Sequence, residues 1–233
     1  MRTTLINYQT GFTLPELMIV IVVLGILTPL IFGPMDDLYQ SNIQNLQIIT
    51  QVTDTRSALR QIERTATISN NFLSANSISD ISGNIPGTAA TTWDWRGTPS
   101  PSPNQQVLIT ENYATDTANR LVMDSGCSTV LKINYVYFVS DGNLYRRTLK
   151  TTPAPIGGVP NPDPTQTNCI GTTTIAQKRT CRVGFSNSNC EGSDNLIVSG
   201  VTSFTISYYL SSTLSNALTG SVDGAKTIVI TLT

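Results

Sequence analysis

Apolar residues are concentrated near the start of the chain, directly after a polar segment that ends at Gly11. From Phe12 to Phe32 almost every side chain is apolar, and Glu16 is the one ionisable group among them. A helix rises about 1.5 Å per residue, so residues 12–34 are long enough to cross a hydrocarbon core of roughly 30 Å. The pattern therefore predicts a membrane-spanning helix over residues 12–34.

The pattern becomes amphipathic after residue 34, where apolar residues recur at mixed three- and four-residue spacings between Gln, Asn, Ser and Thr. The recurring positions are Leu38, Ile43, Leu46, Ile49, Val52, Leu59 and Ile62. This period predicts that the helix continues in water through residues 35–67 with one apolar stripe, which we expect the downstream sheet to cover. Arg56, Arg60 and Arg64 stand four residues apart on this helix. They could dock a partner, but such rows are usually a solvated face, which we favour.

Later segments are rich in β-branched and aromatic residues, which favour strands. Residues 129–139 form such a run, and the sequence Ser-Asp-Gly-Asn at 140–143 predicts a hairpin turn into a strand at 144–147. Further strands are predicted at 195–198, 203–210 and 226–233. One long helix followed by loops and antiparallel strands over residues 68–233 predicts an α+β fold, with the helix lying across the sheet.

Two loop regions carry residues that could bind a ligand. Turn-forming residues dominate 68–106, and Trp93 and Trp95 lie within this stretch. An exposed pair of indole rings could bind a sugar or a surface, but two rings in a loop more often fill the end of a core, and we favour the core. Residues 152–168 carry five prolines. They predict an exposed, partly extended loop, which is either a receptor-binding tip or a variable insertion.

Charge and composition narrow the class of protein. Only 12% of the residues are charged and the net charge is −1, whereas about 25% are charged in an ordinary soluble protein. A surface of Ser, Thr and Asn is typical outside the cytosol, and without a basic excess we predict no nucleic-acid partner. Arg2 precedes the apolar segment, and Asp36 and Asp37 follow it. The positive-inside tendency therefore places the later residues on the outer side of the membrane.

All four cysteines, Cys127, Cys169, Cys181 and Cys190, lie in the part predicted to be exported. An even number in an exported domain favours two disulfides, for which three connectivities are possible. We favour Cys127 with Cys169 and Cys181 with Cys190. A metal site is the competing interpretation, but the sequence has no histidine and no pair of cysteines two residues apart, so we predict no metal.

The sequence gives little support for catalysis or for a cofactor. Without histidine, the Ser-His-Asp and Cys-His mechanisms cannot operate, and no glycine-rich phosphate loop is present. Asp141 and Asp194 lie in short Asp/Gly/Asn turns that could hold calcium, although turns use these residues far more often for their backbone freedom. We therefore predict neither an enzyme nor a bound cofactor.

The residues around Gly11 carry the most specific motif. A secretory signal peptide has its small-residue cleavage site after the apolar region, whereas Gly11 comes before it. The stretch GFTLPEL at residues 11–17, followed by a long apolar run, resembles the processing site of type IV prepilins and type II secretion pseudopilins. The resemblance implies a leader of residues 1–11, cleavage after Gly11 by a prepilin peptidase, methylation of the new amine of Phe12, and packing of the apolar helix into a filament core.

Glu16 has a local interpretation and a functional one. Thr13 and Glu16 have the spacing of a capping box, and Pro15 in the first turn costs no helical hydrogen bond. Yet a carboxylate at the edge of the hydrocarbon needs a cationic partner. Cleavage after Gly11 would create one, the amine of Phe12, in the same chain or in a neighbour. The resemblance implies that Glu16 meets a neighbour's Phe12 amine during assembly, and we favour this pairing.

The apolar helix also contains residues that weaken it. Pro29 cannot donate a hydrogen bond to the carbonyl of Gly25, which costs about 3 kcal/mol in a regular helix, although membrane helices tolerate proline. The result could be a simple kink. The resemblance implies instead a segment that melts on assembly, formed by Gly25, Pro29, Gly33 and Pro34.

Segments further along the chain resemble W-type minor pilins and J-type pseudopilins. These are SALRQIERTAT at 57–67, YFVSDGNLYRR at 137–147, VTSFTISYY at 201–209 and AKTIVITLT at 225–233. Because residues 12–233 are long for a main repeating subunit, we expect a minor pilin or pseudopilin with an exported globular domain at 35–233. The alternative is a membrane-tethered extracellular binding protein or adhesin that does not polymerise.

The resemblance also implies partners and a destination. The expected partners are other pilins or pseudopilins, the prepilin peptidase, an inner-membrane assembly platform and membrane lipid. The chain would first be a single-pass inner-membrane protein with its carboxy-terminal domain outside. It would then join a filament on the cell surface or in the periplasm.

Overall fold

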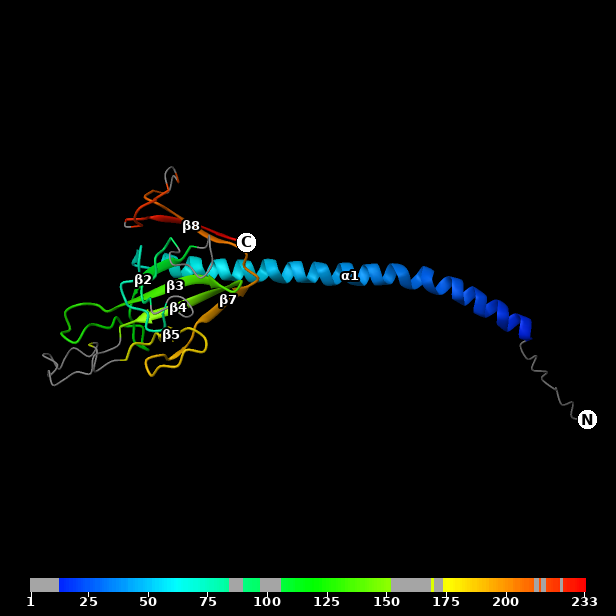
Figure 1. The fold of residues 1–233 in the computed structure, drawn as a ribbon, viewed down its shortest axis with the longest axis horizontal. Helices are drawn as coiled ribbons and strands as arrows, with labels where there is room; N and C mark the ends of the chain where they lie inside the picture. The colour runs from blue at the N-terminus through cyan, green and yellow to red at the C-terminus, as the bar shows by residue number, and fades with distance from the viewer. Residues whose placement is uncertain are drawn as a thin grey trace, which may run out of the picture. The chain divides into compact units, whose positions relative to one another are not determined.

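The computed structural model is of the α+β class. It describes residues 13–83, 90–96, 106–151, 169, 174–211, 214, 217–222 and 224–233. Gly11, Phe12 and the proline-rich segment 152–168 lie outside the described residues, as do the side chains of five helical positions between residues 30 and 37. The chain divides into two compact units, Met1–Thr53 and Asp54–Thr233. The helix α1 (Leu14–Thr67) contributes residues to both (Figure 1).

The described part of the first unit is helical from Leu14 onward. Its large apolar side chains are exposed, including Leu17, Ile19, Leu24, Leu38, Leu46 and Ile49. Pro29 and Pro34 both lie inside α1. Among the described residues, no helix combines the length and the apolar character needed to cross a membrane.

The second unit is built on a five-stranded antiparallel sheet. Its strands are β1 (Asn71–Phe72), β2 (Leu108–Tyr113), β3 (Lys132–Ser140), β4 (Asn143–Lys150) and β7 (Asn195–Ser199), in the order β1-β2-β3-β4-β7. The predicted hairpin joins β3 to β4, and its turn residues Asp141 and Gly142 have φ angles of 51° and 70°. Two consecutive positive φ angles are typical of the tight turns that Asp-Gly favours.

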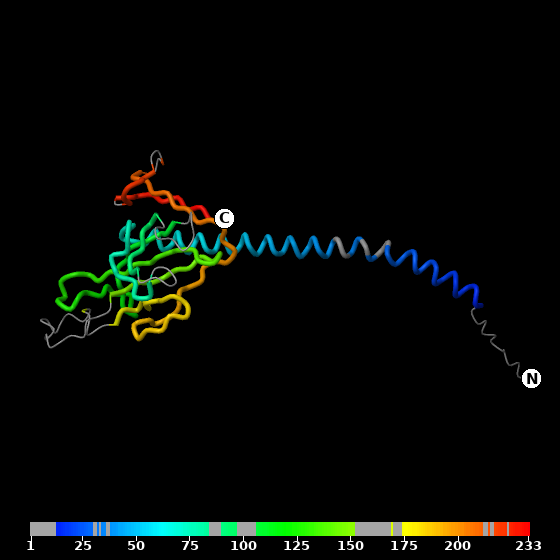
Figure 2. The backbone as a smooth tube through the Cα atoms, viewed as in Figure 1, coloured from blue at the N-terminus to red at the C-terminus, as the bar shows by residue number. Residues whose placement is uncertain are grey.

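Two smaller sheets are also found among the described residues of the second unit. The strands β8 (Phe204–Tyr209) and β9 (Thr227–Leu232) pair with each other in antiparallel orientation and lie at the orange and red end of the chain in Figure 2. The short strands β5 (Thr180–Cys181) and β6 (Gly192–Ser193) pair in parallel. The predicted strands near the end of the chain are therefore present, but β8 and β9 form a sheet of their own rather than extending the main one.

One face of the main sheet packs against the end of α1. Ala58 and Ile62 are buried there in a cluster with strand residues that include Leu108, Tyr137, Leu144, Phe204 and Ile206. The expectation that the sheet covers the whole apolar stripe of the helix is wrong. Leu38 is 65% exposed and Ile43 39% exposed, and the stripe is buried only from residue 58 onward. Arg56, Arg60 and Arg64 are exposed, as a solvated face requires.

The opposite face of the sheet carries a second core cluster of Trp93, Val107, Ile109, Val136, Phe138 and Leu149. Trp93 is 2% exposed and Trp95 is 5% exposed. The two rings lie in different clusters, because Trp95 packs edge-to-face on Tyr208 whereas Trp93 packs on Phe138. The two rings thus fill the core, and the interpretation of an exposed ligand-binding pair is wrong.

Buried tyrosines make the stability of this core depend on alkaline pH. Burial raises the pKa of Tyr135, Tyr137 and Tyr208 above the ordinary value. In the unfolded chain these groups ionise near pH 10, so above that pH the unfolded state holds fewer protons than the folded one. The free energy of unfolding should then fall by about 1.4 kcal/mol per pH unit for each tyrosine kept neutral.

The tyrosine prediction can be checked by ultraviolet titration together with denaturant unfolding at pH 9 to 12. We expect a fraction of the eight tyrosines to ionise near pH 10 and the rest only as the protein unfolds. Tyr208→Phe should reduce the loss of stability with pH. Ionisation of all tyrosines in one step near pH 10, with the protein still folded, would contradict the prediction.

Candidate functional site

The amino-terminal end of α1 is closed by its own glutamate. The backbone N–H of Thr13 donates to Glu16 Oε2 at 3.2 Å, and the Thr13 hydroxyl donates to the same oxygen at 3.0 Å. The first helical bond runs from the N–H of Leu17 to the carbonyl of Thr13 at 3.2 Å. The carboxylate therefore caps the helix as the local interpretation predicts, although the Thr13 hydroxyl donates to Glu16 rather than accepting a bond from its N–H.

The position of the Glu16 carboxylate shows what it could bind. Residues 13–20 are exposed, so the carboxylate is accessible at the start of an apolar helix. Its oxygen Oε2 lies within hydrogen-bond distance of the Thr13 amide, which directly follows Phe12 in the chain. A cationic amine on the preceding residue, or one supplied from outside, could therefore approach the same carboxylate.

The weakened segment of α1 remains helical in the structure. Residues 25–34 are all helical, although Pro29 leaves the Gly25 carbonyl without its usual donor. One residue earlier, the Thr28 hydroxyl donates to the carbonyl of Leu24 at 2.6 Å. A Cβ at Gly25 would meet no atom within 4 Å. Melting of this segment on assembly stays a prediction.

The structure joins Cys127 to Cys169 and Cys181 to Cys190, with Cα–Cα distances of 5.2 and 5.7 Å. This is the connectivity that we favour from the sequence. Among the described residues, no three His, Cys, Asp or Glu side chains lie close enough together to hold a metal ion.

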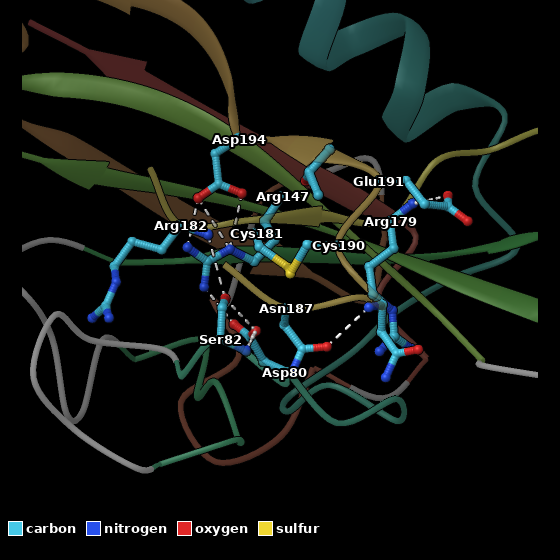
Figure 3. The surroundings of a disulfide bond; sticks show 12 residues. Asp80, Ser82, Arg147, Arg179, Cys181, Arg182, Asn187, Cys190, Glu191 and Asp194 are labelled. Atoms are coloured by element: carbon cyan, nitrogen blue, oxygen red, sulfur yellow. Dashed lines mark hydrogen bonds and ion pairs between the residues drawn. A yellow bond between two sulfur atoms is a disulfide. The ribbon is translucent and has the colours of Figure 1, made fainter. Parts of the chain in front are cut away.

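A buried arginine lies beside the second disulfide and was not predicted. Arg147 of β4 is 1% exposed and lies against the packed rings of Trp93 and Phe138, with its guanidinium carbon 5.3 and 5.1 Å from the two ring centres. Its Nη1 donates to Asp80 Oδ2 at 2.5 Å and to the carbonyl of Gly83 at 2.8 Å. Its Nε donates to Asp194 at 3.0 Å (Figure 3). The two carboxylates hold the pKa of Arg147 above its usual range against the opposing effect of burial.

Asp80 connects this arginine to the loop that covers the sheet. Besides Arg147, its carboxylate accepts bonds from the Trp93 indole N–H at 2.9 Å and from the hydroxyl of Ser82 at 2.8 Å. The backbone N–H of Asp80 donates to the carbonyl of Thr91 at 3.0 Å. The Asp80 carboxylate thus joins its own loop and Trp93 to Arg147 of the distant strand β4.

The two aspartates considered as calcium ligands have separate roles. Asp194 is an ion-pair partner of Arg147, whereas Asp141 occupies the hairpin turn between β3 and β4. They do not form one site. A sequence signal for the buried arginine does exist, because in the alternating strand β4 Arg147 shares a face with Tyr145 and Leu149. A charged residue in that position needs a buried partner.

The apolar helix of the first unit, with one capped carboxylate in its first turn, is the part of the chain that defines its class. Residues 6–28 match the family model of the prokaryotic N-terminal methylation motif, which is a type IV prepilin-like signal. This motif is typical of the type IV pilin-like and pseudopilin class. That class is structural rather than enzymatic, has pilin partners and is processed by a peptidase. The motif also implies an amino-terminal membrane anchor. No curated protein and no solved structure matches the chain.

Proposed function

We propose that the protein is a minor pilin or pseudopilin, a structural subunit of a type IV pilus or a type II secretion pseudopilus without catalytic activity. The methylation motif at residues 6–28 carries the proposal. In this proposal residues 1–11 are a leader removed after Gly11, residues 12–34 are the membrane and assembly helix, and residues 35–233 form the exported domain. Similarity of later segments to W-type minor pilins and J-type pseudopilins supports the minor role.

The exposure of the first unit supports assembly through its helix. Leu17, Ile19 and Leu24 are each more than half exposed. Keeping such a side chain in water rather than burying it costs about 1.5–3 kcal/mol. Lipid can cover these side chains before assembly, and helices of neighbouring subunits can cover them afterwards. The chain would thus move from the inner membrane into a surface or periplasmic filament, with the assembly platform acting between the two.

Glu16 and Phe12 would make the contact that selects the next subunit. The carboxylate already lies at the end of α1 next to Thr13, so a neighbour's Phe12 amine can approach it from the same end. A cationic amine would add the attraction of a full positive charge, whereas both donors that bond to the carboxylate now, the Thr13 N–H and hydroxyl, are uncharged. Gly25, Pro29, Gly33 and Pro34 would then let the helix melt locally as the subunits pack.

Site-specific photocross-linking in cells can test the assembly proposal. A photoreactive residue in place of Leu24, which is 57% exposed, should cross-link to other chains that carry the methylation motif, and the products should disappear when the prepilin peptidase is deleted. The same probe at Val183, an exposed position of the second unit, is the matched control and should not give these helix-to-helix products. Cross-links from Leu24 to lipid alone would instead indicate a tethered protein that does not polymerise.

A further inference from the structure

The disulfide Cys181–Cys190 lies next to the buried charges, as Figure 3 shows. Cys181 ends β5, and Cys190 comes shortly before β6, which pairs with β5. The bond therefore closes the short loop between these two strands. We call residues 179–194, which carry this loop, the stapled segment.

Backbone bonds hold both acidic residues of the stapled segment against its first strand. The N–H of Asp194 donates to the carbonyl of Cys181 at 2.9 Å. The N–H of Glu191 donates to the carbonyl of Arg179 at 3.0 Å, and the N–H of Arg179 returns a bond to Glu191 Oε2 at 2.8 Å. The orientation of the two carboxylates thus depends on the strand pairing that the disulfide closes.

Polar groups of the stapled segment bond to three residues of β4. Asp194 accepts bonds from Arg147, and Glu191 Oε1 accepts a bond from Lys150 Nζ at 2.6 Å. Between these two contacts, the N–H of Thr148 donates to the Thr180 hydroxyl at 2.8 Å. These bonds involve residues 147, 148 and 150 of one strand, so the segment fits β4 only in one register.

The balance of buried charges explains why loss of the stapled segment would destabilise the core. Three cations, Arg147, Lys150 and Arg179, face three carboxylates, those of Asp80, Glu191 and Asp194. If the stapled segment leaves, Arg147 keeps Asp80, but its Nε and Nη2 lose their acceptors while the guanidinium remains against two aromatic rings. Leaving a buried charge without its bonds is strongly destabilising.

We propose that closure of the Cys181–Cys190 disulfide is coupled to assembly of the buried charge cluster around Arg147, so the second face of the sheet is completed only when the chain is oxidised. Two thiols exchange with the disulfide of a donor, the new bond forms between Cys181 and Cys190, and the donor leaves as a dithiol with both electrons and both protons. The inference goes beyond the proposed function, because it concerns the second unit alone and holds whether or not the chain polymerises.

Loop entropy alone makes a different prediction. The Cys127–Cys169 bond spans 42 residues and the Cys181–Cys190 bond spans 9. If each bond only restricted the unfolded chain, the longer loop would contribute more, and neither contribution would depend on Arg147. Coupling to the charge cluster is therefore the property to measure.

A thermodynamic cycle on the full-length chain in detergent tests the proposal. Cys181 and Cys190 are both changed to Ser, in the parent chain and in a neutral variant that carries Arg147→Met and Asp194→Asn. Asp80 still accepts bonds from Ser82 and Trp93 in the neutral variant. All chains also carry Trp95→Phe, so Trp93, which contacts both Asp80 and Arg147, is the only tryptophan.

The readout is the unfolding equilibrium constant from a denaturant titration followed by Trp93 fluorescence and circular dichroism. Loss of the Cys181–Cys190 bond should raise this constant about tenfold more in the parent chain than in the neutral variant. The matched control, Cys127→Ser with Cys169→Ser, should raise it by the same factor in both backgrounds. An equal factor in both backgrounds for Cys181–Cys190 would overturn the proposal.

If the serine variants do not fold, a second measurement tests the coupling between the disulfide and the charge cluster. Chains with all four cysteines are equilibrated with dithiothreitol, the free thiols are alkylated, and the reduced fraction of each disulfide is read by mass spectrometry. Coupling predicts that Cys181–Cys190 is reduced about tenfold more readily in the neutral variant than in the parent. Unchanged reduction of Cys181–Cys190 in the neutral variant would contradict the proposal.

Discussion

Replacing Glu16 with glutamine is expected to leave cleavage after Gly11 and membrane insertion intact and to abolish incorporation into filaments. Glutamine can keep the cap, because its side-chain oxygen also accepts a bond from the Thr13 N–H. It carries no charge, so it cannot form an ion pair with a Phe12 amine. The measurement is the amount of the variant in sheared filaments relative to the amount in membranes, with at least a tenfold decrease expected for the loss of a partly buried charge pair.

A second variant distinguishes the capping role of Glu16 from its pairing with a Phe12 amine. Thr13→Val removes the hydroxyl that bonds to Glu16 but keeps the backbone donor and the carboxylate. If pairing is the role of Glu16, Thr13→Val should still be incorporated. If Glu16→Gln enters filaments normally, the carboxylate only caps the helix and the assembly role is wrong.

Replacing Arg147 with alanine is expected to lower the free energy of unfolding by about 3–5 kcal/mol, because Asp80 and Asp194 are then buried without their cation. The arginine also packs against Trp93 and Phe138, so its loss removes packing as well as charge. Denaturant titration of the full-length chain in detergent, followed by circular dichroism, measures the change.

An exposed arginine provides the matched control for this experiment. Arg56 is exposed on α1, and Arg56→Ala should change the free energy of unfolding by about 0.5 kcal/mol or less. A loss of less than about 1 kcal/mol for Arg147→Ala would mean that the buried cluster contributes little. The proposed link between the cluster and the disulfide would then have no basis.

The sequence predicted well the elements that depend on a local residue pattern. The long helix follows from its apolar run and amphipathic period, and the β3–β4 hairpin follows from an Asp-Gly turn between two strand-like runs. The cleavage motif is likewise a local pattern, and the family model matches it. In each case the signal lies within a few neighbouring residues.

Elements that depend on distant contacts were missed. No strand is predicted from the sequence at β2, which contains the polar residues Thr110, Glu111 and Asn112, and these are buried between β1 and β3. Arg147 is similar, because its carboxylates come from residues 80 and 194. The length of the helix that the sheet covers was also overestimated. A periodic apolar stripe shows that one face of a helix needs a packing partner, but it does not show which part of the protein, or which other molecule, that partner is.

The most direct test of the central claim is mass spectrometry of the mature protein isolated from membranes and filaments. The proposal predicts an amino-terminal peptide that begins at Phe12 and carries one methyl group on its α-amine. Gly11→Leu should leave the leader attached and remove this peptide. A mature chain that still begins at Met1, or one that begins beyond Phe32 and has lost the apolar helix, would contradict the account.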